Sequence, residues 1–162
     1  MQSKKFSASE PSDKNARAAA LTLAARRDYT AAELTDKLLD RGFDAETIAG
    51  AIDDLRARRI VDDARVAAAH VRTASAIKGR GRIRIARELT ARGVAAEVIS
   101  AALETVARED EMASIRRILA RKRWTPGAPM AVRQKLYRHL LGRGFPSDLI
   151  GKALGRDSGD DQ

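Results

Sequence analysis

The sequence predicts an all-α protein made of three tandem three-helix repeats, each like a helix–turn–helix unit, in an elongated, curved array. Three observations support this fold class. Ala, Leu, Arg and Glu dominate, prolines are few, and aromatic residues make up only 4% of the 162 residues. Apolar residues recur at helical spacing. The phrase RGFDAETI at 41–48 returns as RGVAAEVI at 92–99 and RGFPSDLI at 143–150.

The repeated phrase predicts a corner between two helices. Its glycine follows a leucine by four positions, and an apolar residue comes directly after it. A left-handed glycine commonly ends a helix, and such an ending packs these two apolar residues together. The signature positions are the glycines Gly42, Gly93 and Gly144, the isoleucines Ile48, Ile99 and Ile150, and the alanines Ala51, Ala102 and Ala153.

A further helix is expected upstream of each corner, because two short helices rarely bury a core. In the first repeat, Thr30 and Glu33 predict a capping box that opens the middle helix. The connection before the middle helix lengthens along the chain, from DY through KGRG to TPGAP. The expected first helices span 15–27, 62–77 and 109–124.

These elements predict five segments. The repeats are expected at 15–61, 62–107 and 108–156, with the third the most basic. A flexible basic and polar tail at 1–14 is expected before them, and an acidic tail at 157–162 after them.

Positive charge rises along the chain. Lysine and arginine number 31 against 22 acidic residues, a net charge of +9. The first repeat, counted over 17–61, has 8 cations and 8 anions, whereas 108–156 has 12 cations and 4 anions, a net charge of +8. Such a balance favours polyanionic partners.

Two basic stretches are candidate partner or DNA surfaces. KGRGRIRIAREL at 78–89 is either an electropositive loop and helix start or a solvated connection; it lacks the sequence of a phosphate-binding P-loop. The third repeat adds RRILARKRW and RQKLYRHLLGRG, in which Leu141 is expected to face the core. Trp124 and Tyr137 are candidates for stacking on bases or on a partner. The candidate cations are Lys78, Arg80, Arg82, Arg84, Arg87, Arg116, Arg117, Arg121, Lys122, Arg123, Arg133, Lys135 and Arg138.

Other kinds of site are not indicated. The chain has no cysteine, and its two histidines, His70 and His139, fall in different repeats, so we expect no metal site. No nucleophile has an evident base beside it, so no enzyme, cofactor or small-molecule substrate is expected. No apolar run approaches a membrane span and no signal peptide is evident, which predicts a cytoplasmic protein.

Taken together, the repeats resemble the RecX family of bacterial regulatory proteins over about 18–154. LAARRDYTAAELTDKLLDRGF at 23–43 is similar to the family's first unit, and IVDDARVAAAHV at 60–71 to the opening of the second. GRIRIARELTARGV at 81–94 and RQKLYRHLLGRGFPSDLI at 133–150 resemble the second and third corners.

The resemblance implies a regulator that binds the nucleoprotein filament of the RecA recombinase. It would inhibit the recombinase, ATPase and coprotease activities of RecA in recombination and SOS repair, with single- and double-stranded DNA contacted through basic surfaces. The alternative is a sequence-independent DNA-binding protein, because three-helix units with tight corners are also found in DNA readers. A structural scaffold for other helical proteins is a third class, without a specific feature in its favour.

Overall fold

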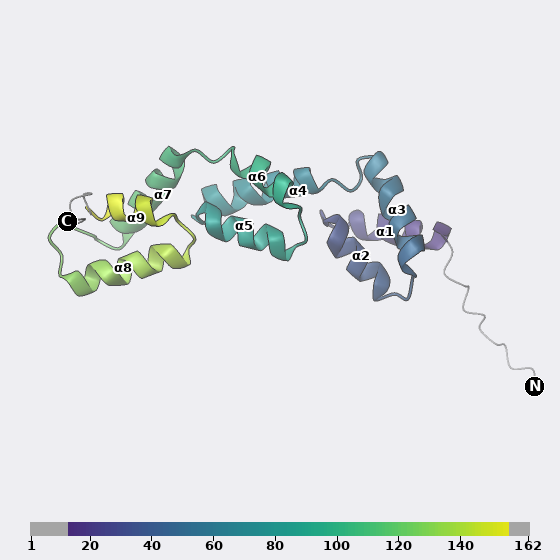
Figure 1. The fold of residues 1–162 in the computed structure, drawn as a ribbon, viewed down its shortest axis with the longest axis horizontal. Coiled ribbons are helices and arrows are strands. Elements are labelled where there is room, and N and C mark those ends of the chain that lie inside the picture. The colour runs from purple at the N-terminus through teal and green to yellow at the C-terminus, as the bar shows by residue number, and fades with distance from the viewer. Residues whose placement is uncertain (1–12, 156–162) are drawn as a thin grey trace, which may run out of the picture. The chain divides into compact units, whose positions relative to one another are not determined.

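The computed structural model describes residues 13–155, so most of the predicted N-terminal tail and the whole predicted acidic tail lie outside the described residues. Between 13 and 155 the chain folds into nine α-helices and one π-helical turn, without a β-strand (Figure 1). The chain divides into two compact units, with the boundary between Val66 and Ala67. The predicted all-α class is confirmed.

The first unit contains the first predicted repeat. Its helices are α1 (Asp13–Ala24), α2 (Ala31–Leu39) and α3 (Ala45–Ala57), and α4 (Asp63–Arg72) begins at its end. The predicted capping box is present, because Glu33 N–H donates to Thr30 Oγ1 at 3.1 Å and Thr30 N–H donates to Glu33 Oε2 at 2.9 Å. The apolar faces of the three helices bury one core, which includes Leu34, Leu38, Ile48, Ile52 and Leu55.

The second unit contains the other two predicted repeats, each with its own core. The predicted helix at 62–77 does not continue as an α-helix: after α4 the chain forms the π-turn η1 (Thr73–Ile77). Each middle helix buries one face in the core of its repeat. The buried residues include Ile85 and Leu89 in the second repeat and Leu136 and Leu140 in the third. The remaining helices are α5 (Arg82–Ala91), α6 (Ala96–Leu103), α7 (Arg108–Arg121), α8 (Met130–Gly142) and α9 (Ser147–Ala153).

The three corners adopt the predicted left-handed glycine ending. The φ angles are +85° at Gly42, +74° at Gly93 and +85° at Gly144. In the first corner Phe43 N–H donates to Leu38 O at 3.3 Å and Gly42 N–H donates to Leu39 O at 2.9 Å, the two bonds of a Schellman motif. The other two corners repeat both bonds. The prediction for the phrase is therefore confirmed, and its three isoleucines, Ile48, Ile99 and Ile150, are all buried.

Two helices end at an arginine, not a glycine, in the left-handed conformation. Arg59 and Arg123 have φ angles of +56° and +53°, after α3 and α7 respectively. Ile60 N–H donates to Leu55 O, and Trp124 N–H donates to Leu119 O, so both endings are stabilised by the hydrogen bond that the glycine corners use. Trp124 and Tyr137 are half-buried and pack against the third core, so part of each ring is covered by the protein itself.

The second and third repeats are joined end to end through backbone hydrogen bonds. The C-terminal end of α8 lies beside the N-terminal end of α5 (Figure 1). Gly81 N–H donates to Arg143 O at 2.9 Å, and Ile83 N–H donates to Gly144 O at 3.1 Å. The negative end of one helix dipole therefore meets the positive end of another, which is favourable. The contact is so close that a Cβ on Gly81 would lie 2.3 Å from Gly144 O.

One predicted core residue is wrong. Leu141 lies on α8 beside the buried Leu140, but 46% of its surface is exposed. Residues 136 and 140 already point one face of the helix into the core, and residue 141 is turned about 100° away from residue 140. The helical period therefore places Leu141 on the flank of α8.

Candidate interaction surfaces

Five of the predicted cations lie on the exposed side and end of α7. Ile115 and Leu119 are buried, so the helix turns Arg116 and Arg117 toward solvent. Arg121, Lys122 and Arg123 follow at the exposed C-terminal end. Arg117 donates to Ser114 Oγ at 2.9 Å. Within 13–155, none of the five forms an ion pair with an acidic side chain.

Three further predicted cations lie on α8, and two of them, Lys135 and Arg138, lie on the side away from its buried leucines. Lys135 and Arg138 are exposed, and Arg133 is half-buried. The end of α8 also brings positive charge close to the end of α7. Burial, followed by the charges of Arg143 and Lys122, lowers the pKa of His139 below its ordinary value. We call these eight cations of α7 and α8 the basic region of the third repeat.

The predicted basic loop of the second repeat is arranged differently. Arg80 Nη1 lies 2.6 Å from Glu88 Oε2, and Arg84 Nε lies 2.9 Å from Glu88 Oε1. His70 Nε2 also lies 2.9 Å from Glu88 Oε2. Although burial alone raises the pKa of Glu88, the hydrogen bonds from Arg84, His70 and Arg80 outweigh it and hold that pKa below its ordinary value. Lys78 and Arg87 are exposed and form no ion pair with a described residue.

Arg82 joins the second and third repeats through Glu111. Its backbone N–H donates to Glu111 Oε1 at 3.0 Å and its Nε donates to Glu111 Oε2 at 2.8 Å. Its Nη2 also donates to Val106 O at 2.8 Å. The Glu111 side chain is only 2% exposed, so this carboxylate is a buried cap for α5. Three of the five candidate cations in 78–87 therefore make structural ion pairs.

Sequence reasoning missed Glu111, yet the first unit contains a related contact. There Asp63 Oδ1 accepts a hydrogen bond of 2.8 Å from Ala31 N–H, at the start of α2. Asp63 Oδ2 also lies 3.7 Å from Arg56. In both cases an acidic residue from the first helix of one repeat caps the middle helix of the preceding repeat. An acid near the start of each first helix is the sequence signal for this contact.

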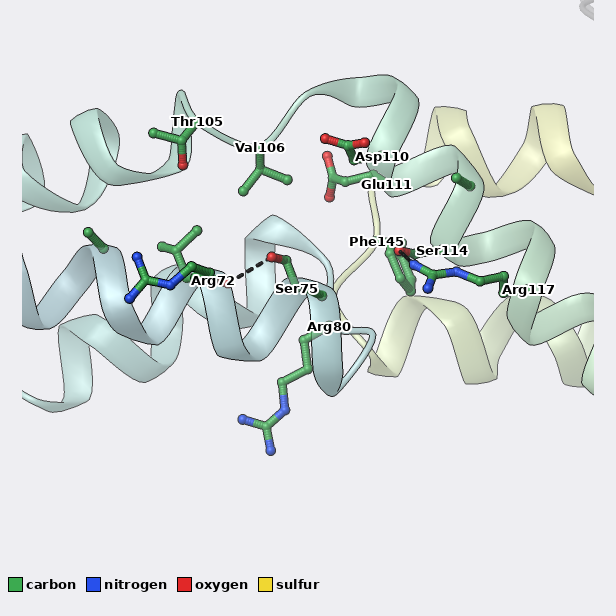
Figure 2. A pocket seen from close by; sticks show the side chains of 14 residues that line it. Arg72, Ser75, Arg80, Thr105, Val106, Asp110, Glu111, Ser114, Arg117 and Phe145 are labelled. Atoms are coloured by element: carbon green, nitrogen blue, oxygen red, sulfur yellow. Dashed lines mark hydrogen bonds between the residues drawn. The ribbon is translucent and has the colours of Figure 1, made fainter.

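A cleft of about 500 Å³ lies between the second and third repeats, inside the second unit (Figure 2). The π-turn and α4 form one wall with Arg72 and Ser75, and α7 forms the other with Asp110 and Glu111. The Ser75 hydroxyl donates to Val71 O at 2.8 Å, so it is not a free nucleophile. Arg80 points away from the cleft toward Glu88. The Thr105 hydroxyl, which also lines the cleft, donates to Ala102 O at 2.7 Å, and Ser114 Oγ accepts a hydrogen bond from Arg117.

Residues 13–155 contain no cluster of three or more His, Cys, Asp or Glu side chains placed to hold a metal ion. Over the same residues, no helix is both long and apolar enough to span a membrane.

Three domain models of one family match the chain in order. They describe the first, second and third three-helix domains of RecX and match residues 16–55, 62–103 and 109–154. The predicted tandem repeats are therefore confirmed as three-helix domains of this type, while the predicted boundaries stay predictions.

Curated relatives match over most of their length. A regulatory protein RecX of Halorhodospira halophila is 37% identical over 148 residues, covering 90% of this chain and 90% of the relative. A regulatory protein RecX of Chromohalobacter salexigens is 36% identical over 135 residues, covering 83% of this chain and 88% of the relative. The crystal structure of RecX from Lactobacillus salivarius aligns with a TM-score of 0.81 at 20% identity, covering 89% of this chain and 95% of that one. That alignment supports the fold.

Proposed function

Since the chain belongs to the RecX family of regulatory proteins, we propose that it regulates the RecA recombinase by binding the RecA nucleoprotein filament. The observation that carries the proposal is the set of three RecX domains, in order, over 16–154. Binding would inhibit strand exchange, ATPase and coprotease activity in recombination and SOS repair, by blocking filament growth or by promoting disassembly. The site of action would be the cytoplasm.

The repeat architecture supports binding to a polymer. A filament offers the same surface many times, and a chain of three related domains can make several weak contacts at once. Linked weak contacts give a combined affinity well above that of any one of them. No catalytic arrangement is required, because binding alone changes the stability of a filament by mass action.

DNA contact is proposed as an auxiliary interaction. The basic region of α7 and α8 would attract the phosphates of single- or double-stranded DNA inside or beside the filament. Its strongest candidates are the exposed cations that form no ion pair with a described acid, whereas Arg80, Arg82 and Arg84 already hold carboxylates. Lys78 and Arg87 are secondary candidates.

A plain DNA-binding protein is the second candidate function. The observation that favours it is the net charge of +8 over 108–156. Such a protein would inhibit RecA only by occupying DNA, so it would need enough copies to cover the DNA. A filament regulator acts at far lower ratios, because one bound copy affects many protomers.

The test is RecA's DNA-dependent ATPase and strand exchange, measured with this chain at about one copy per hundred RecA protomers. We expect both activities to fall. When RecA is limiting and its concentration is held constant, doubling the amount of DNA should leave the fractional inhibition unchanged. Inhibition that requires one copy per DNA site and disappears with added DNA would favour the plain DNA-binding protein. Unchanged activities at every ratio would contradict the proposal.

A further inference from the structure

Five basic side chains from three segments of the second unit lie next to one another around His139. Lys135, His139 and Arg143 are spaced four residues apart on α8 and its C-cap, so they share one side of the helix. Arg143 Nη2 donates to Lys78 O at 3.3 Å, which places the loop after the π-turn beside this end of α8. Lys122, directly after α7, lies close enough for its charge to act on His139. We call these five residues the His139 strip.

The His139 strip is accessible and has no acid of its own. Four of its members are exposed and Arg143 is half-buried. None of the five forms an ion pair with a described residue. The segment 112–147, which supplies four of them, contains no aspartate or glutamate. Because like charges at short range repel one another, a bound anion would stabilise this arrangement.

Acids on the neighbouring helices do not neutralise the strip. The acidic residues of α7 lie in its first turn, at the opposite end from Lys122. The charged residues of α9 are Asp148 and Lys152, and Asp148 pairs with Arg108 at the start of α7. On α5, Glu88 pairs with arginines of its own repeat. The strip is therefore a surface without negative charge.

His139 gives the strip a charge that depends on pH. Burial, followed by the charges of Arg143 and Lys122, holds the pKa of His139 below its ordinary value of 6.5, so the imidazole of the free protein is neutral at pH 7. A phosphate beside the imidazole has the opposite effect, because an anion favours the protonated form. Binding of a polyanion would therefore take up a proton and would be tighter at lower pH.

A nucleic-acid backbone matches this surface better than an acidic protein does. Successive members of the strip on α8 are about 6 Å apart along the helix axis. A DNA strand presents an unbroken row of phosphates to such a row of cations. Carboxylates on a protein surface are interspersed with cations and apolar groups, for which the strip offers no partner.

We propose that the His139 strip binds the phosphate backbone of DNA, with His139 as a contact that forms when its imidazole is protonated. The inference rests on the proposed function, because it locates the auxiliary DNA contact. Lys122 and Lys135 belong to the basic region of the third repeat, and the strip adds Lys78, His139 and Arg143 to them. The other cations of the basic region would contribute long-range attraction only.

The first test follows DNA affinity against pH. Fluorescence anisotropy would report binding of the full chain to a labelled single strand and to a labelled duplex, between pH 7.5 and pH 5.5 at constant ionic strength. We expect the affinity of the wild type to rise about three- to tenfold as the pH falls. The log–log salt slope should steepen by roughly 0.9 on duplex and roughly 0.7 on single strand, as for one added phosphate contact.

Substitutions at the two histidines assign this pH dependence. His139→Gln should lose the gain in affinity at low pH, and His139→Arg should show it already at pH 7.5. The matched control is His70→Gln, because His70 Nε2 lies 2.9 Å from Glu88 Oε2 and already has an anion beside it. This variant should keep the wild-type pH dependence.

The second test separates location from total charge. Lys78→Gln with Lys135→Gln removes two cations from the strip, and Arg116→Gln with Arg138→Gln removes the same charge outside it. Arg116 is turned about 120° from Lys122 around α7, and Arg138 about 100° from His139 around α8. At pH 7.5 the strip pair should weaken duplex binding about tenfold and reduce the salt slope by roughly 1.8. The other pair should weaken it less than about threefold, and circular dichroism should show wild-type helix content in all variants.

The possible outcomes separate this inference from the proposed function. A wild-type pH dependence in His139→Gln, or equal losses in the two charge pairs, would overturn the strip alone. Poly-glutamate that binds as tightly as DNA, with the same dependence on His139, would overturn the assignment to DNA. A pH-dependent gain confined to one form of DNA supports the strip for that form. A wild type that binds neither DNA at any pH would overturn the auxiliary DNA contact and the strip with it, whereas inhibition of RecA is measured separately.

Discussion

Gly42 and Gly144 occupy the same position in the first and third repeats and share one backbone conformation, but their surroundings differ. Both have a φ angle of +85°. A Cβ added to Gly42 would meet no atom within 4 Å, whereas a Cβ on Gly144 would lie 2.3 Å from the backbone nitrogen of Arg84. At position 42, glycine is therefore favoured only by the left-handed backbone conformation. At position 144, glycine is favoured for that reason and also because the close contact between the third and second repeats leaves no space for a side chain.

The largest difference between the two corners is expected on substitution by alanine. Gly144→Ala should cost about 4 kcal/mol of unfolding free energy, because the left-handed strain is added to a collision with a backbone that cannot move aside. Gly42→Ala should cost only about 1 kcal/mol, from the left-handed strain alone. Urea denaturation of the two variants measures both values. Equal losses would mean that the α8–α5 contact contributes nothing to stability.

The joint should also depend on the buried carboxylate of Glu111. Glu111→Ala leaves the first amide of α5 and the Arg82 guanidinium without their acceptor, so we expect a loss of about 3 kcal/mol. Glu109→Ala, at an exposed position on the same helix, is the matched control and should cost less than about 0.5 kcal/mol. Thermal denaturation followed by circular dichroism provides the comparison. Similar melting temperatures for the two variants would show that the buried pair does not hold the repeats together.

A smaller and pH-dependent effect is expected at Glu88, which pairs with Arg80, Arg84 and His70. The folded pKa of Glu88 lies below its ordinary value of 4.5, so its contribution is complete above that value and is lost as the pH falls. Glu88→Gln should cost on the order of 1 kcal/mol at pH 7 and flatten the fall in stability below pH 4.5. Urea denaturation from pH 3 to pH 7 measures both effects. The exposed Glu97→Gln is the control and should keep the wild-type slope; an unaltered slope in Glu88→Gln would contradict the assignment.

The smallest expected effect is a gain in stability at a corner without glycine. Arg59 has a φ angle of +56°, which strains every residue except glycine. Arg59→Gly should therefore stabilise the first unit by about 0.5 kcal/mol, as measured by urea denaturation. Arg58→Gly, one residue earlier and without a positive φ, should destabilise it. A loss of stability in Arg59→Gly would show that the arginine side chain contributes more than its backbone costs.

The local fold could be predicted from the sequence because each corner is specified by residues close in the chain. Leu38, Gly42 and Phe43 determine the first corner by their spacing, and Thr30 with Glu33 determines the start of α2. The prediction for Leu141 is wrong because it followed the apolar character of the residue and its position beside Leu140. The helical period of Leu136 and Leu140 turns Leu141 to the flank of α8, where 46% of its surface is exposed.

The joint between repeats could not be predicted, because its contacts connect residues far apart in the sequence. Arg82 and Glu111 are 29 residues apart, and Gly81 and Arg143, which share a backbone hydrogen bond, belong to different repeats. A cluster of arginines has the same sequence whether its members are free for a phosphate or bound to buried acids. The loop at 78–87 therefore suggested one basic surface, while the structure assigns Arg80, Arg82 and Arg84 to ion pairs.

The central claim is that the chain recognises the recombinase filament as a protein surface and not only as charged DNA. The most direct measurement titrates the variant Arg121→Glu, Lys122→Glu, Arg123→Glu against free duplex, free single strand and preformed RecA filament in parallel, over a range of salt concentrations. We expect affinity for both free DNAs to fall and the log–log salt slope on duplex to shrink by roughly 0.9 for each lost phosphate contact. Affinity for the filament should fall by a clearly smaller factor. A drop by the same factor on all three would contradict the claim and leave a sequence-independent DNA-binding protein.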